Sequence, residues 1–192
     1  MLLQNTKMAN YKLTPHELAL VGLTGAVICI LGPFAILLPF SPVPITFGLL
    51  GVMLSACLLG PRLGTISCLI YLLVGTVGLP VFSGFLGGPA ILFGPTGGYL
   101  IGYLWIPLLS GRFALHSKNI YVNHISGLLL GLLLCYISGT LWLAHVLELD
   151  FFSALFLGVL PYIPMDLVKL GFACFLGGLL RKRLKKAGLL AT

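Results

Sequence analysis

Two oppositely charged residues, Asp166 and Lys169, lie three positions apart in a C-terminal stretch that is otherwise apolar. Residues at this spacing share one face of a helix. A carboxylate accepts hydrogen bonds and an ammonium donates them, so the pair can bind a polar ligand or form a structural ion pair. Asp166 follows Pro164 and also suits a helix N-terminus, whereas a cation there is unfavourable. We therefore predict that the pair contacts a ligand.

The surrounding composition is that of a membrane protein. The chain has 192 residues, of which 59% are hydrophobic and 8% charged, against about 25% charged in soluble domains. Its mean hydropathy of +1.12 excludes a disordered chain. The apolar stretches are continuous, which argues against a transmembrane barrel. In such a chain a charged group must be paired or face a cavity.

Six apolar runs predict an all-α protein with six transmembrane helices, since one span needs about 20 apolar residues. Proline and glycine clusters separate several of these runs. The segment 151–160 is too short to cross and is predicted to be interfacial, re-entrant or a lead-in to the next helix. We expect one transmembrane domain, 16–181, between a tail at 1–15 and a basic tail at 182–192. The six runs are 18–40, 45–60, 63–79, 94–110, 125–147 and 161–180.

The basic residues predict the orientation. With both termini in the cytoplasm, ten of the eleven lysines and arginines lie on the inner side, and Glu148 and Asp150 lie outside, as the positive-inside rule requires. We therefore expect a multi-pass protein of the plasma membrane, and the net charge of +7 does not indicate nucleic acid binding. The ten basic residues are Lys7, Lys12, Arg62, Arg112, Lys118, Arg181, Lys182, Arg183, Lys185 and Lys186.

The residues indicate no catalytic or metal centre. The five cysteines lie in apolar runs and form neither a CxxC pair nor a cluster with histidine, so we expect no metal site and no disulfide framework. A membrane-embedded enzyme would need a nucleophile with a base, or clustered metal ligands, and no such arrangement is present. We predict that the protein is not an enzyme and has no cofactor.

Five stretches, in order, resemble the BioY family, the biotin-specific S components of energy-coupling factor transporters. The resemblance implies a six-helix protein that binds biotin from the outside. It also implies a transmembrane scaffold partner and two cytoplasmic ATPases; the chain has no GxxxxGK[ST] motif, so any ATP hydrolysis occurs elsewhere. A stand-alone biotin carrier and an S component for another vitamin are the alternatives. The five stretches are 42–46 (PVPIT), 59–64 (LGPRLG), 78–82 (GLPVF), 94–100 (GPTGGYL) and 160–169 (LPYIPMDLVK).

The resemblance also implies binding residues. Asp166 and Lys169 correspond to the family's acid and lysine in the last helix. The family usually has a glutamine where this chain has Gly48, and some relatives have an amide or an arginine near the third connection, where Ser83 and Thr96 are the polar side chains here.

Biotin has a ureido ring, an apolar thioether ring and a carboxylate tail, and each has a candidate partner. Asp166 can accept the ureido N–H bonds, and Lys169 can donate to the ureido carbonyl or pair with the tail. Aromatic side chains can cover the ring system, although helix packing or lipid contact would also explain them. Glycines at 94–98 would let backbone N–H groups approach an anion, and hydroxyls can contact the ligand or cap a turn. The further candidates are Thr46, Phe82, Ser83, Phe85, Thr96, Gly97, Tyr99 and Tyr162.

Small residues on the first helix predict a close contact with another helix. They are Gly22 and Ala26, with Ala19 and Gly25 nearby. The family resemblance implies that this face meets the scaffold subunit, and packing within the same chain is the alternative.

Overall fold

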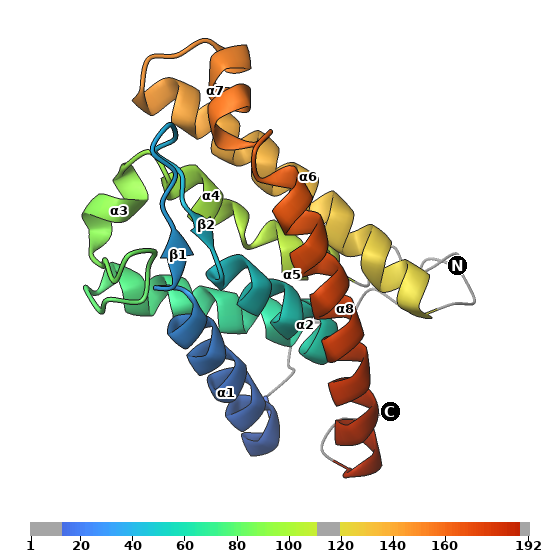
Figure 1. Ribbon diagram of the computed structural model, residues 1–192. Helices are drawn as coiled ribbons and strands as arrows, with labels where there is room; N and C mark the ends of the chain where they lie inside the picture. The colour runs from blue at the N-terminus through green and yellow to red at the C-terminus, as the bar shows by residue number, and fades with distance from the viewer. Residues whose placement is uncertain (1–12, 111–119, 189–192) are drawn as a thin grey trace, which may run out of the picture.

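The computed structural model describes residues 13–110 and 120–188 (Figure 1). Four basic residues used to predict the orientation, Lys7, Lys12, Arg112 and Lys118, lie outside these residues, as does most of the predicted N-terminal tail.

The described part of the chain is mostly helical. Three helical stretches are long and apolar enough to cross a membrane, 48–76, 125–146 and 163–184, and 15–31 and 97–109 are shorter apolar helices. The elements are α1 (Pro15–Leu31), β1 (Ala35–Ile36), β2 (Ile45–Thr46), α2 (Gly48–Thr76), α3 (Pro89–Phe93), α4 (Gly97–Gly102), α5 (Trp105–Leu109), α6 (Ile120–Val146), α7 (Phe151–Gly158) and α8 (Ile163–Lys186).

The first helix is shorter than the apolar run that predicted it. Thr14 and Glu17 form a capping box at its start, with the Glu17 N–H donating to Thr14 Oγ1 at 3.2 Å. It ends at Leu31, not near residue 40, because Pro33 has no N–H to continue the helical hydrogen bonds. The residues beyond Pro33 instead place β1 antiparallel to β2. The chain between these two strands is thereby brought to the binding site.

The second and third predicted runs form the two halves of α2, which is sharply broken between them. Gly60 has φ 79° and ψ −170°, which glycine adopts readily, and Pro61 begins the second half. A β-carbon added at Gly64 would lie 3.2 Å from Ala56 Cα, and one at Gly48 would lie 3.5 Å from the Tyr71 hydroxyl. The two halves therefore run back along each other, and the break predicted at Pro61 is confirmed.

The fourth run forms α4 and α5, which pack closely on α6. Glycines allow this approach: a β-carbon at Gly102 would lie 3.1 Å from Cys135 Cα, and one at Gly131 would lie 2.5 Å from Ile106 Cα.

The segment after α6, predicted to be too short to cross a membrane, forms the short helix α7. Asp150 caps it by accepting the Ser153 N–H at 3.1 Å. The side-chain and backbone hydrogen bonds from Ser153 hold the pKa of Asp150 below its usual range. Phe152 and Phe156 remain exposed on α7, as expected for a segment lying against lipid.

The helix α8 lies beside α2 and α6, and its first turns carry the charged pair. A β-carbon at Gly177 would lie 2.5 Å from Cys57 Cβ, so α8 and the first half of α2 are in close contact. In Figure 1, α7 lies toward one end of the molecule and the C-terminal end of α8 toward the other. The helix continues to Lys186, so the basic residues 181–186 are helical.

Candidate ligand-binding site

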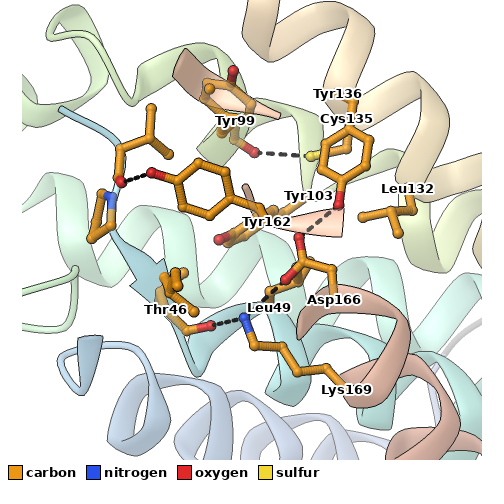
Figure 2. Close-up of a pocket in the computed structure, with 14 residues that line it drawn as sticks. Thr46, Leu49, Tyr99, Tyr103, Leu132, Cys135, Tyr136, Tyr162, Asp166 and Lys169 are labelled. Atoms are coloured by element: carbon orange, nitrogen blue, oxygen red, sulfur yellow. Dashed lines mark hydrogen bonds and ion pairs between the residues drawn. The ribbon is translucent and has the colours of Figure 1, made fainter. Parts of the chain in front are cut away.

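Asp166 and Lys169 form a buried ion pair at the start of α8 (Figure 2). Lys169 Nζ lies 2.9 Å from Asp166 Oδ1, and the two residues are 6% and 4% exposed. The prediction that they share one helix face is confirmed. Because the charges compensate each other, the pair as a whole is neutral.

Two other elements hold this pair in place. Lys169 Nζ donates to the Thr46 carbonyl oxygen at 2.9 Å, and the Tyr136 hydroxyl of α6 donates to Asp166 Oδ2 at 2.7 Å. An ammonium has three N–H donors and a carboxylate has about four acceptor positions. Within the described part of the chain, these contacts leave Lys169 one unused N–H donor and leave Asp166 unused acceptor positions.

The pair lines a pocket, which we call the inner pocket. The segment that contains β2, the helices α4 and α6, and the start of α8 surround it, as Figure 2 shows. Four tyrosines give it an aromatic wall. Its lining residues are Val43, Pro44, Ile45, Thr46, Leu49, Tyr99, Tyr103, Leu132, Cys135, Tyr136, Gly158, Tyr162, Asp166 and Lys169.

A second pocket of about 750 Å³, the outer pocket, adjoins the first. The two share five lining residues, so one wall separates them. None of the described residues that line the outer pocket is charged, and its polar side chains are hydroxyls. It is lined by Leu37, Pro42, Val43, Pro44, Thr46, Phe82, Ser83, Leu86, Ile91, Pro95, Thr96, Tyr99, Leu100 and Tyr103.

The segment 41–46, which we call the strap, forms part of the wall between the pockets. The Tyr162 hydroxyl donates to the Val43 carbonyl oxygen, and Lys169 binds the carbonyl oxygen of Thr46. At the other end of the strap, Ser41 Oγ donates to the Leu157 carbonyl oxygen at 2.8 Å. Hydrogen bonds thus hold the strap to the end of α7, to the residue just before α8 and to the first turns of α8.

The structure brings most of the predicted residues to these pockets. Tyr99 and Tyr162 line the inner pocket, while Phe82, Ser83 and Thr96 line the outer one. Thr46 lines both, but its hydroxyl donates to the Gly32 carbonyl oxygen and accepts the Gly48 N–H at 2.9 Å. The Thr46 side chain therefore caps a turn, and its carbonyl oxygen is the group that meets Lys169.

Two predicted residues line neither pocket. Phe85 is 61% exposed and packs edge-on against Phe34, with ring centroids 5.7 Å apart. The Gly97 N–H donates to the Gly94 carbonyl oxygen at 3.0 Å, so this donor is already used inside the turn. A β-carbon at Gly97 would collide with the Leu92 carbonyl oxygen, which gives this glycine a packing role.

Sequence reasoning did not find Tyr136, Tyr103 and Cys135. They line the inner pocket from α6 and from the turn after α4. Tyr136 lies in an apolar run, and its only sequence signal is a polar hydroxyl within a predicted span. Which side of that span faces Asp166 depends on how α6 packs against α8.

Three of the four small residues predicted to make a close contact lie on the outward side of α1, whereas Gly25 lies on the inner side. Ala19, Gly22 and Ala26 are exposed, and a β-carbon at Gly22 would meet no atom within 4 Å. The internal contact is made by the opposite face, where Thr24 Oγ1 lies 2.8 Å from Ser67 Oγ and Gly25 approaches Ile70. Among the described residues, packing within the chain therefore does not account for Gly22.

The chain is similar to known proteins along nearly all of its length. Residues 5–186 match the family model of the BioY family. Biotin transporter BioY2 of Lactococcus lactis subsp. cremoris is 38% identical over 169 residues, 87% of each chain. The probable biotin transporter BioY of Pyrococcus horikoshii is 43% identical over 129 residues, 67% of this chain and 75% of the relative. The crystal structure of the S-component for biotin from an ECF-type ABC transporter superposes with a TM-score of 0.78 at 34% identity, covering 86% of this chain and 90% of that one.

Proposed function

The chain belongs to the BioY family, and we propose on that premise that it is the biotin-binding S component of an energy-coupling factor transporter. One observation carries the assignment of the site: the buried Asp166–Lys169 pair lines a pocket in which both residues keep hydrogen-bonding capacity. A purely structural pair would not require a pocket beside it.

The geometry suits a neutral, polar ring. The ureido group has two N–H donors and one carbonyl acceptor, which match the free acceptor positions of Asp166 and the remaining donor of Lys169. The Tyr136 hydroxyl holds Asp166 Oδ2 and so limits the directions from which the carboxylate can accept. The aromatic rings of Tyr99 and Tyr162 provide surface for the thioether ring.

Entry of the ligand requires the strap to move. In the structure Lys169 donates to the Thr46 carbonyl oxygen, and the ureido carbonyl is an equivalent acceptor. Exchange of one acceptor for the other leaves the ammonium satisfied, so release of the Thr46 end of the strap costs little when biotin is present. The exchange releases only the Thr46 end of the strap, because Tyr162 still holds the Val43 carbonyl oxygen and Ser41 still binds Leu157.

In the proposed topology the chain crosses the plasma membrane six times, and both termini lie in the cytoplasm. The two halves of α2 count as two spans, and α4 with α5 counts as one. The acidic Glu148 and Asp150 precede α7, and the basic residues end α8, which supports this orientation. The transmembrane domain then corresponds to 16–181.

The partners of the family assembly would dock on the outward side of α1. The small residues Ala19, Gly22 and Ala26 permit close helix contact there. An apolar groove of about 730 Å³ follows the neighbouring side of α1 and supports the docking of an apolar helix of a transmembrane scaffold subunit. It is lined by Leu20, Leu23, Thr24, Val27, Gly51, Leu54, Ser55, Leu58, Leu59, Leu180 and Leu184. Two ATPase subunits would supply the energy.

Calorimetric titration of the purified protein with biotin and other vitamins tests the proposal. We expect biotin to bind, and Asp166→Asn and Lys169→Ala each to weaken binding at least about tenfold, because each removes a charge-assisted hydrogen bond. Asp150→Asn and Lys186→Ala are matched controls outside the pockets and should bind as the wild type does. Near wild-type affinity in both site variants would sink the assignment. Biotin uptake in a host lacking the scaffold and ATPases would instead favour a stand-alone carrier.

A further inference from the structure

The charges of the two pockets differ from those expected for an anionic ligand. Biotin carries a carboxylate, yet Asp166 and Lys169 are the charged side chains among the described lining residues, and they compensate each other. A second carboxylate in the inner pocket would be buried without a counter-charge, which is strongly unfavourable. The charged end of the ligand therefore belongs outside the inner pocket.

The outer pocket can receive that end without binding its charge. Ser83 and Thr96 are half-buried there, so the pocket reaches the surface, and its other lining residues include Leu37, Phe82 and Ile91. Hydroxyls hydrogen-bond to a carboxylate, an amide or an ester, and each of these groups offers them a carbonyl acceptor. Such a lining discriminates poorly between a charged and a neutral tail.

We propose that the protein recognises biotin by its ureido head alone and accepts neutral tail derivatives, the amides and esters of the biotin carboxylate, as ligands. This inference rests on the proposed function, because it takes biotin as the ligand and the ion pair as the partner of the ureido ring. It adds a class of ligand: any molecule with an intact bicyclic head and a tail that ends in an uncharged carbonyl group.

Competition between biotin, biotinamide and biotin methyl ester for the purified protein tests the inference. We expect the dissociation constants of the amide and the ester to lie within about threefold of that of biotin, since no cationic side chain among the described lining residues of the outer pocket pairs with the tail. The head-altered analogue 2-iminobiotin, in which a cationic group replaces the ureido carbonyl, should bind more than about tenfold more weakly because it faces the Lys169 ammonium.

The outcomes separate this inference from the proposed function. If biotin binds but the amide and ester are both weakened more than about tenfold, the tail charge is recognised and the inference is overturned while the function stands. If biotin itself does not bind, the proposed function fails and the inference fails with it.

A charge introduced into the outer pocket provides a second measurement. Ser83→Lys places a cation where the tail would lie. The affinity for biotin should therefore rise by about tenfold or more relative to the affinity for biotinamide. Ser83→Met has a side chain of similar length without charge and should leave the ratio of the two dissociation constants near one. An unchanged ratio in Ser83→Lys would place the tail elsewhere and overturn the inference.

Discussion

The Asp166–Lys169 pair shows why a single substitution cannot separate a structural role from a binding role. Both side chains are buried, and Lys169 is the residue that ties the strap to α8. Removal of one member leaves an uncompensated buried charge, which costs about 3–5 kcal/mol. A loss of biotin binding in such a variant can therefore reflect lost stability as well as a lost contact.

Removal of both charges together separates the two roles. We expect the double variant Asp166→Asn/Lys169→Met to lower the unfolding temperature less than Lys169→Ala does. In the double variant neither charge remains buried and unpaired. Biotin affinity should still fall at least about tenfold, since the charge-assisted bonds are gone. Thermal unfolding and calorimetry of the same preparations provide the two readouts. A double variant that binds like the wild type would show the pair to be structural only.

The two faces of the helix α1 have different surroundings. Its inner face packs on α2 through Thr24 and Gly25, while Gly22 and Ala26 face away from the described remainder of the chain. Bulk added to one face should affect folding, and bulk added to the other should affect assembly.

Leucine substitutions on α1 test this division. We expect Gly22→Leu and Ala26→Leu to keep biotin binding in the purified protein but to reduce uptake at least about tenfold in cells with the scaffold and ATPases. Gly25→Leu, the matched control on the inner face, should lower thermal stability and binding, because its β-carbon position already lies 3.6 Å from Ile70. Equal loss of binding in all three variants would favour a packing role for the whole helix.

The sequence predicts helix breaks better than it predicts helix ends or contacts between helices. The break at Pro61 follows from local chemistry, and the glycine before it has a positive φ, which glycine adopts readily. The run 18–40 was too long because hydropathy does not distinguish a membrane helix from an apolar strand, and the strand β1 exists only through its pairing with β2. Pro33 was the local signal for the helix end.

The same limit applies to the binding site. Asp166 and Lys169 could be predicted because both residues lie on one helix, three positions apart. Tyr136 and Tyr103 could not, because their place in the pocket depends on how separate helices are rotated against each other. Phe85 was chosen as an aromatic next to the site, but it lies on the exposed side of its turn.

At the scale of the whole molecule, charge is distributed unevenly along the direction of α8. The connection before α7 carries Glu148 and Asp150, whereas the far end of α8 carries basic residues from Arg181 to Lys186 (Figure 1). Basic flanks remain on the cytoplasmic side during insertion. The strap and the Asp166–Lys169 pair lie at the N-terminal end of α8, opposite its basic end. In the proposed topology both pockets therefore take up the ligand from the outer side.

Epitope tags test this orientation in intact cells. A tag inserted between Glu148 and Leu149 should be accessible to antibody without permeabilisation, because this connection has no lysine or arginine to retain it in the cytoplasm. A tag at the C-terminus should be accessible only after permeabilisation, since it follows the basic end of α8. Retained biotin binding in both tagged proteins controls for correct folding. Two tags accessible from the same side would exclude a membrane crossing by α8, and the reverse pattern would place the binding pockets on the cytoplasmic side, where they could not capture external biotin.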